Sequence, residues 1–206
     1  MPDTPIAPPA QGVPDIADPL RLFEQWLAEA EAHEINDPNA MSLATATPEG
    51  RPSVRAVLLK GADERGFVFY TNFDSRKGGE LHANPNAALL FHWKSLRRQV
   101  RIEGSVEPVS DAEADAYFAS RARVSRLGAL ASDQSRPMPS RAEFERRVAE
   151  ADAKYPGDTV PRPAHWSGMR VRPEAMEFWQ DMPFRLHDRR LYARAGDTWS
   201  RSTLYP

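Results

Sequence analysis

The 206-residue sequence predicts an α+β fold in which a β-barrel or sandwich carries peripheral helices. Two observations lead to this prediction. Strand-length segments with alternating or β-branched residues lie within 41–109, and turn residues separate them. The region 110–154 instead has helical spacing, and a last section from 168 onward returns to the strand pattern. No internal repeat is visible in the sequence, so we expect one domain of this class.

The composition limits the classes of function. The formal net charge is −2 and the pI is near 6.2, so a broad basic surface for nucleic acid is not expected. The chain has no cysteine, which excludes disulfides, thiolate metal sites and cysteine nucleophiles. No apolar run approaches the roughly 20 residues of a membrane-spanning helix, and the N-terminus lacks a charged-then-apolar signal. We therefore expect a soluble, cytoplasmic protein.

The N-terminal segment 1–18 contains five prolines and little that could form a core. We expect a flexible arm there, followed by a single domain over 19–206. Asp18 and Pro19 are typical of an N-cap and a first helical position. The helix that they open places its apolar residues on one stripe: Leu20, Phe23, Trp26, Leu27 and Ala30.

The middle region contains segments of strand length at 41–47, 53–60, 66–72, 86–93 and 98–109. The turn sequences PEGRP and ADERG join the first three segments, which predicts antiparallel hairpins. A helix-like stretch, SRKGGELHANP, interrupts the strands before the fourth segment.

Two helices are predicted after the strands. Ser110 with Glu113, and Ser140 with Glu143, have the spacing of capping boxes. A proline-rich connection then leads to the last β section, with segments at 168–180, 185–196 and 198–206.

The first candidate binding segment is RAVLLK, residues 55–60. A cation stands at each end, with apolar residues between, and strand alternation places Arg55 and Lys60 on opposite faces. Such a strand suits a ligand with an apolar body and anionic ends. The alternative is that both charges extend from the strand ends into water.

The second segment, residues 74–79, resembles a phosphate loop without the spacing of one. Asp74 or Ser75 can cap a helix whose free N–H groups and dipole would bind phosphate. Arg76 and Lys77 add two full charges there. The glycines that follow cost about 1 kcal/mol each in helix propensity, which favours a close approach of backbone or ligand. A solvated basic turn is the alternative.

The third segment is AYFASRARVSRLG. On one helix Tyr117, Arg121 and Ser125 would share a face, because they are four residues apart, and together they could clamp a phosphate. The alternative is the polar side of an amphipathic helix.

The fourth segment is EFWQDMPFRLHDRR. Arg185, His187 and Arg189 would alternate to one side of a strand, near Trp179. A serine hydrolase site at His187 is not supported, because no Gly-x-Ser-x-Gly elbow exists. The histidines also lack the spacing of metal ligands, so no metal site is expected.

In this order the segments resemble the pyridoxine/pyridoxamine 5′-phosphate oxidases, flavoproteins with an FMN-binding split-barrel fold. The resemblance runs from about Asp18 to Pro206. It rests on RAVLLK, FYTNFDSRKGGEL, RRQVRIEG, YFASRARVSRLGALASDQS, EFWQ and RLHDR. It implies FMN, a homodimer with the FMN site at the subunit interface, and oxidation of pyridoxine or pyridoxamine 5′-phosphate to pyridoxal 5′-phosphate. Oxygen would accept the electrons, hydrogen peroxide would leave, and the amine would also yield ammonia.

The resemblance also assigns residues. It implies FMN contacts from Arg55, Ala56, Val57, Leu58, Leu59, Lys60, Tyr70, Thr71, Arg76, Lys77, Gln99, Gln134, Ser135, Trp179 and Arg189, the last four from the partner subunit. It implies substrate contacts from Lys60, Tyr117, Arg121, Ser125, Arg185, Leu186 and His187. Arg185 and His187 would flank the reacting carbon as catalytic residues. Asp37 is a weaker match to an acidic residue near the site.

The sequence departs from the family pattern at two places. The arm 1–18 has no Arg-x-x-Tyr segment, which many members close over the substrate. Asp181 follows Gln180 where the family commonly has glycine. Two other functions stay open: a split-barrel flavin oxidase of another aromatic substrate of the phenazine type, and a non-catalytic carrier of flavin or pyridoxal phosphate. The residues of the phosphate clamp argue against the first of these.

Overall fold

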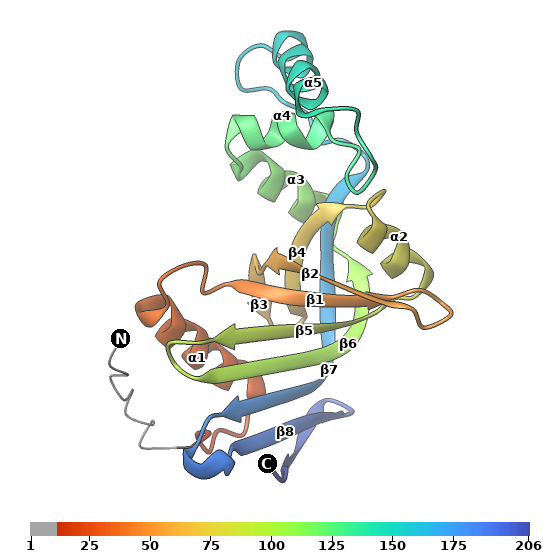
Figure 1. Cartoon of the computed structure of the whole chain (residues 1–206). Helices are drawn as coiled ribbons and strands as arrows, with labels where there is room; N and C mark the ends of the chain where they lie inside the picture. Colours follow the sequence, from red (N-terminus) through yellow and green to blue (C-terminus); the bar gives the residue numbers. More distant parts are fainter. Residues whose placement is uncertain (1–11) are drawn as a thin grey trace.

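The computed structural model describes residues 12–206, and its main feature is an antiparallel sheet of nine strands within this range that curls into a half-barrel (Figure 1). Helices cover the sheet on one side and extend from one end of it. The prediction of an α+β barrel with peripheral helices is confirmed.

The strands are β1 (Ala40–Ala46), β2 (Pro52–Leu58), β3 (Gly61–Asp63), β4 (Gly66–Asn72), β5 (Asn86–Trp93), β6 (Arg98–Pro108), β7 (Trp166–Gln180), β8 (Asp188–Ala195) and β9 (Thr198–Thr203). The helices are α1 (Pro19–His33), α2 (Arg76–Ala83), α3 (Asp111–Ser120), α4 (Arg123–Ala131), α5 (Arg141–Lys154) and the short 3₁₀ turn η1 (Pro183–Arg185). The sheet order is β2-β1-β5-β6-β7-β4-β3, with β8 beside β7 and β9 beside β8. Each strand-length segment predicted within 41–109 forms a strand.

β7 is the longest strand and connects the two ends of the molecule. Its first half pairs with β4 and its second half with β8, while β6 runs along its other edge. The register between β6 and β7 shifts after Glu103. A side chain at Gly104 would lie 1.9 Å from the carbonyl oxygen of Arg172, so only glycine fits this bulge. A strand of this length spans roughly 45 Å, which is enough to carry two separate sites.

The main core lies between α1 and the sheet. The N-cap prediction is confirmed, because the Asp18 carboxylate accepts a hydrogen bond from the backbone of the first turn. Phe23 meets Phe67 edge-on, with ring centroids 4.9 Å apart, and Trp26 meets Phe178 in the same way at 5.3 Å. Edge-to-face aromatic packing of this kind anchors the helix on the sheet.

α3, α4 and α5 stand together at one end of the sheet, where β4 and the start of β7 lie (Figure 1). A smaller core holds them there, formed by Phe118, Leu127, Val160 and Trp166. The predicted capping box at Ser110 is present. Ser140 also caps its helix, whereas the Glu143 carboxylate pairs with Arg146.

The expectation of one continuous helix from Tyr117 to residue 125 is wrong. α3 ends at Ser120, whose hydroxyl donates to the Tyr117 carbonyl and so competes with continued helix. Arg121 is extended, residue 122 with φ of −53° and ψ of 138° is also non-helical, and α4 begins at Arg123. The guanidinium of Arg123 binds backbone carbonyls after α5, which fixes the direction of the new helix.

Residues 1–11 of the predicted arm lie outside the described range, and residues 12–18 lie against β8. The N–H of Val13 donates to Asp188 Oδ2 at 2.7 Å. The Tyr192 hydroxyl donates to the Ile16 carbonyl at 2.6 Å, and Val13 itself is buried. These contacts connect the N-terminal segment to the strand that follows His187.

Candidate active site

A cavity of about 540 Å³, here called the ligand cavity, opens between β2, β4, the start of α2 and the corner between α3 and α4. It brings together many of the predicted ligand-binding residues: Arg55, Ala56, Val57, Leu58, Lys60, Tyr70, Thr71, Lys77, Tyr117, Arg121, Ser125 and Gln134. Three residues that were not predicted complete the lining: Asn72, Ala122 and Trp166. The cavity therefore unites motifs that are far apart in the sequence.

The N-terminus of α2 forms one wall of the ligand cavity. Ser75 caps the helix, and its Oγ accepts the N–H of Gly78 at 3.3 Å. The ammonium group of Lys77 donates to Gln134 Oε1 at 2.7 Å, within the same chain. Burial, and then the positive charge of Arg55, lower the pKa of Lys77 to about 8. A cation destabilised in this way gains from an anionic ligand.

The two glycines of α2 differ. A side chain at Gly78 would lie 2.2 Å from the carbonyl oxygen of Phe73, so the close approach expected from the sequence is one of backbone to backbone. A side chain at Gly79 would meet no atom of residues 12–206 within 4 Å. Only the first glycine is therefore required by packing.

Glu80 holds Arg55 at the cavity wall. Thr45 and Ser53 donate hydroxyl hydrogen bonds to its Oε2, Arg55 Nη2 lies 3.4 Å from the same atom, and Arg76 Nε donates to Oε1 at 2.8 Å. Burial by itself would raise the pKa of Glu80, but the hydrogen bonds from Ser53, Thr45 and Arg76 outweigh it and lower the pKa to about 2. Arg76, predicted at the FMN phosphate, thus binds Glu80 and does not line the cavity.

Aromatic rings form the opposite wall. Tyr70 stacks on Tyr117 with centroids 3.9 Å apart and on Trp166 at 5.3 Å. The Arg121 guanidinium lies 4.7 Å above the Trp166 ring. Its Nη1 is buried without a hydrogen-bond partner in the described chain, and burial lowers the pKa of Arg121. An unpaired buried donor costs about 1–3 kcal/mol, so this site is suited to an anion that would accept its hydrogen bond.

A second group of predicted residues, here called the Trp179 cluster, comprises Gln99, Trp179, Arg185, His187 and Arg189. Trp179 lies opposite Gln99 on β6 and opposite Arg189 on β8. The rings of Trp179 and His187 are 4.5 Å apart. Arg189 Nε donates to Glu177 Oε1 at 2.8 Å. The cluster thus combines an aromatic surface, an imidazole and cations.

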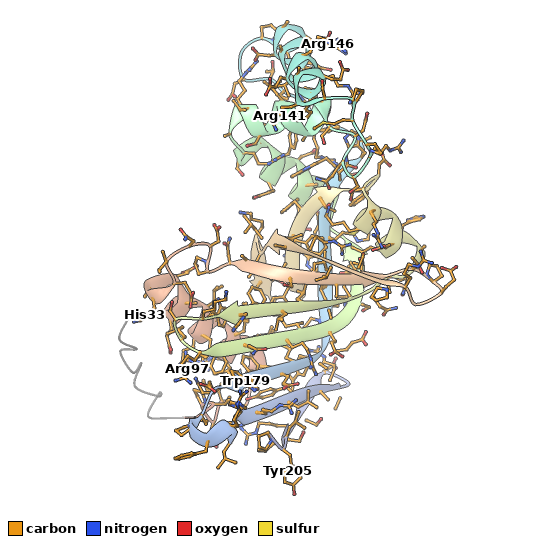
Figure 2. All side chains as sticks on the ribbon, viewed as in Figure 1. His33, Arg97, Arg141, Arg146, Trp179 and Tyr205 are labelled. Atoms are coloured by element: carbon orange, nitrogen blue, oxygen red, sulfur yellow. The ribbon has the colours of Figure 1, made fainter. Side chains whose placement is uncertain are left out.

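The Trp179 cluster and the ligand cavity lie at opposite ends of β7. Trp166, at the first position of the strand, lines the cavity, whereas Trp179 is one residue from its end. Figure 2 shows Trp179 near Arg97 at one end of the molecule, and Arg141 and Arg146 of α5 at the other. One chain therefore cannot bring both groups to one small ligand.

The prediction that Arg185 and His187 alternate on a strand is wrong. β8 begins only at Asp188, and η1 precedes it. Pro183 lacks an N–H and fixes φ, which favours a turn over strand pairing. Phe184 and Arg185 then have φ of 59° and 65°, a conformation that non-glycine residues rarely adopt. Backbone strain of this kind is often found at functional sites.

Four further predicted residues lie outside the ligand cavity. Leu59 is buried in the main core, and Leu186 is exposed. Ser135 follows Gln134 in a loop, with φ of 72°. Asp37 lies between α1 and β1, with φ of 43°.

Sequence reasoning did not assign Trp166 or Glu80 to the site. For Glu80 a signal was available, because it stands four residues after Arg76 on a helix, the spacing of an ion pair. For Trp166 the only signal was a tryptophan directly after a proline-rich connection.

Family models match most of the chain. Residues 27–155 match pyridoxamine 5′-phosphate oxidase, and residues 166–206 match the C-terminal dimerisation region of pyridoxine 5′-phosphate oxidase. The chain is 67% identical over 190 residues to the pyridoxine/pyridoxamine 5′-phosphate oxidase of Gluconobacter oxydans, covering 92% of this chain and 95% of that protein. The chain belongs to the pyridoxine/pyridoxamine 5′-phosphate oxidase family.

Another relative supports this membership. The pyridoxine/pyridoxamine 5′-phosphate oxidase of Rhodospirillum rubrum is 67% identical over 194 residues, covering 92% of this chain and 96% of that protein. The second matched region contains β7, β8 and β9, and so the Trp179 cluster except Gln99. A match to a dimerisation region indicates that this oxidase family member forms a homodimer.

Solved structures show the same split-barrel fold. PhzG from Burkholderia lata, in complex with tetrahydrophenazine-1-carboxylic acid, superimposes with a TM-score of 0.88 at 34% identity, covering 93% of this chain and 94% of that chain. A pyridoxamine 5′-phosphate oxidase-related, FMN-binding protein from Nostoc punctiforme has a TM-score of 0.75 at 19% identity, which shows the fold alone. It covers 93% of this chain and all of that chain.

Two further findings concern residues 12–206 of this oxidase. None of their helices is long and apolar enough to cross a membrane. No three acidic or histidine side chains in this range are grouped so that they could hold a metal ion.

Proposed function

We propose that this protein is an FMN-dependent oxidase that converts pyridoxine 5′-phosphate and pyridoxamine 5′-phosphate into pyridoxal 5′-phosphate. Oxygen accepts the electrons, hydrogen peroxide is released, and the amine also yields ammonia. The observation that carries the proposal is the presence of two sets of cations in one cavity, Arg55 with Lys77 and Lys60 with Arg121. A phosphorylated cofactor and a phosphorylated substrate need one set each.

The residues present fit FMN. The N-terminus of α2 supplies N–H groups and the destabilised ammonium of Lys77 for the FMN phosphate. Glu80 holds Arg55 beside it, and residues 56–58 of β2 supply an apolar edge for the ring system. When bound at these residues, FMN would supply the two-electron acceptor for the hydride at C4′ of the substrate, with oxygen as the final acceptor.

The second set of cations fits the substrate phosphate. Arg121 has a buried Nη1 that lacks a partner among residues 12–206, and Lys60, Tyr117 and Ser125 line the same cavity. Binding a phosphate at this place contributes affinity far from the reacting carbon, and that affinity aligns the carbon for reaction.

The partner subunit completes each site. Because the Trp179 cluster lies about 40 Å along β7 from Trp166, we propose that the cluster of one subunit reaches the cavity of the other. Trp179, Arg189 and Ser135 of the partner then contact FMN. Gln134, also expected from the partner, lines the cavity of its own chain, where it accepts a hydrogen bond from Lys77. Gln99, which lies opposite Trp179, contacts the flavin ring in this proposal. Arg185 and His187 of the partner flank the substrate carbon, with Leu186 beside them.

The boundaries and the location of the enzyme belong to the same proposal. Residues 19–206 form a single FMN-binding domain, preceded by the arm 1–18, and the enzyme works in the cytoplasm. A phenazine-type oxidase is not favoured. The sequence identity to PhzG is 34%, whereas the sequence identity to each of the two pyridoxine/pyridoxamine 5′-phosphate oxidases is 67%.

Anaerobic reduction tests this function. The purified protein should show a flavin absorption spectrum that bleaches when pyridoxine 5′-phosphate is added without oxygen and returns when oxygen is admitted. Unphosphorylated pyridoxine is the matched control and should bleach the flavin far more slowly. A colourless protein would exclude all flavin functions, and a yellow protein that never bleaches would indicate a carrier.

A further inference from the structure

The carboxylate of Asp181 bridges two side chains from different elements. Its Oδ1 lies 3.0 Å from His187 Nδ1, and its Oδ2 contacts the guanidinium of Arg97, in the turn between β5 and β6. The side chains of Asp181 and His187 are each 15% exposed, so the contact between them is largely shielded from water. A carboxylate offers only acceptors, and the contact with His187 is therefore attractive when Nδ1 carries a proton.

The backbone around Asp181 is tied to the same turn. The N–H of Asp181 donates to the carbonyl of Arg97 at 3.0 Å, and Gln180 Nε2 donates to the same oxygen at 3.2 Å. The imidazole of His187 packs on Trp179. Asp181 is thus held by its main chain as well as its side chain, and its carboxylate can fix the direction of the imidazole ring.

Two neighbours of His187 Nδ1 favour different tautomers of the ring. The N–H of Met182 points at His187 Nδ1 from 3.3 Å and would favour a ring whose proton is on Nε2. Asp181 is closer and favours the ring with the proton on Nδ1. The carboxylate therefore decides between the two tautomers.

The charges around His187 favour a neutral ring. Burial, and then the positive charges of Arg185, Arg97 and Arg189, lower the pKa of His187. The carboxylate of Asp181 contacts the ring at Nδ1. A neutral ring with its proton on Nδ1 has a free lone pair on Nε2.

We propose that Asp181 is a positioning residue that holds His187 with Nε2 free to accept the proton leaving the hydroxyl of pyridoxine 5′-phosphate. This inference rests on the proposed oxidase function. As the alcohol becomes an aldehyde, the carbon loses a hydride, and with it two electrons, to the flavin. The hydroxyl oxygen loses its proton to Nε2, and the Asp181 carboxylate stabilises the resulting imidazolium.

The variant Asp181→Asn tests this assignment, because asparagine has one acceptor and one donor group in place of two acceptors. Arg97 offers only donors, so the amide oxygen faces Arg97 and the amide NH₂ faces His187. Nδ1 must then act as an acceptor, which moves the ring proton to Nε2 and removes the lone pair that the reaction needs.

Nitrogen NMR of the holoenzyme with ¹⁵N-labelled histidine reports which ring nitrogen carries the proton. The chain has five histidines, and the signals missing from His187→Gln identify the relevant ring. We expect a proton on Nδ1 in the wild type and on Nε2 in Asp181→Asn. In the variant, kcat for pyridoxine 5′-phosphate falls about tenfold or more, and KM changes less than about twofold.

The matched control is Asp188→Asn, which removes the next carboxylate along the chain. Asp188 binds the N–H of Val13, so the tautomer and kcat should stay as in the wild type. An Asp181→Asn enzyme that keeps both the wild-type tautomer and the wild-type kcat would overturn the inference. If the wild type itself never oxidises the substrate, the proposed function fails, whereas the NMR comparison still decides whether Asp181 sets the tautomer of His187.

Discussion

The cations of the ligand cavity and of the Trp179 cluster differ in whether they are paired within the protein. In the cavity, Arg121 has a buried nitrogen without a hydrogen-bond partner in the described part of the chain, and Lys77 has a pKa of about 8. In the Trp179 cluster, the cation Arg189 is already paired with Glu177. Arg121 and Lys77 of the cavity are therefore ready for a ligand, although Arg55 beside them is paired with Glu80, whereas Arg189 of the cluster is neutralised within the protein.

The difference separates two tasks. Unsatisfied cations gain free energy when an anion arrives, which suits the binding of two phosphates. Paired charges gain little from an anion, but they fix the direction of neighbouring side chains, which suits alignment of a reacting carbon. The cavity therefore contributes binding affinity for the two phosphates, and the cluster fixes the orientation of the groups around the reacting carbon.

The largest expected effect is the recovery of activity when a variant with a defective ligand cavity forms mixed dimers with a variant whose Trp179 cluster is defective. Arg121→Ala and His187→Gln should each have very low activity alone when the substrate concentration is near the wild-type KM. Dissociating and reassociating a one-to-one mixture should recover about a quarter of wild-type activity, because about half of the dimers are mixed and each of these has one intact site. Activity assays before and after mixing measure this, and no recovery would mean that both regions act in one subunit.

A smaller effect is expected when the cavity loses a residue that binds the substrate phosphate. Arg121→Ala should raise KM for pyridoxine 5′-phosphate by about 10–100-fold, because a charged hydrogen bond to phosphate is worth about 1.5–3 kcal/mol. The dissociation constant of FMN, measured by flavin fluorescence, should change little. Equal losses of affinity for the substrate and for FMN would show that Arg121 binds the FMN phosphate.

The two glycines of α2 offer a test of the scaffold beneath the cavity. Gly78→Ala should destabilise the fold by about 1–3 kcal/mol, since the new methyl group would collide with the Phe73 carbonyl. Gly79→Ala, the matched control, should stabilise it by about 0.5–1 kcal/mol. Urea unfolding measures both, and similar effects at the two positions would contradict the close contact between Gly78 and the Phe73 carbonyl.

The smallest expected effect is a pH dependence of FMN binding. Lys77 is protonated below a pKa of about 8 and loses its charge above it, so FMN affinity should fall a few-fold as pH rises through 8. Titrations of the apoprotein with FMN from pH 6.5 to 9.5, a range of about three units, measure it. Lys77→Arg should give a flatter profile, because arginine keeps its charge. An equally steep profile in that variant would assign the pH dependence to another group.

Local signals in the sequence predicted much of the fold. The cap at Asp18, the capping box at Ser110 and the strand around Arg55 depend on neighbours a few residues away, and the structure has each of them. This strand, β2, ends at Leu58, so the expected alternation does not extend to Lys60. The family motifs predicted most residues of the ligand cavity. They did not indicate which residues lie at which end of β7.

The failures involve distant contacts. The break before α4 depends on Arg123 binding carbonyls at Tyr155 and Gly157. The late start of β8 depends on where it meets the end of β7. Trp166 belongs to the site because it stacks on Tyr70, far away in sequence. Neighbouring residues contribute to the first two, because Ser120 competes with continued helix and Pro183 favours a turn. The partners of Arg123 and Trp166 are distant in sequence, and no local pattern indicates them.

The length of β7 has a consequence for the whole assembly. One strand joins the cavity to the Trp179 cluster. The number of residues in β7 therefore sets the distance between these two regions, and with it the spacing between the two active centres of a dimer. Removing two residues from its middle would keep each remaining side chain on its face, since strand faces alternate with a period of two. It would also shift the cluster by about 7 Å relative to the cavity, so both centres of the dimer would be mismatched together.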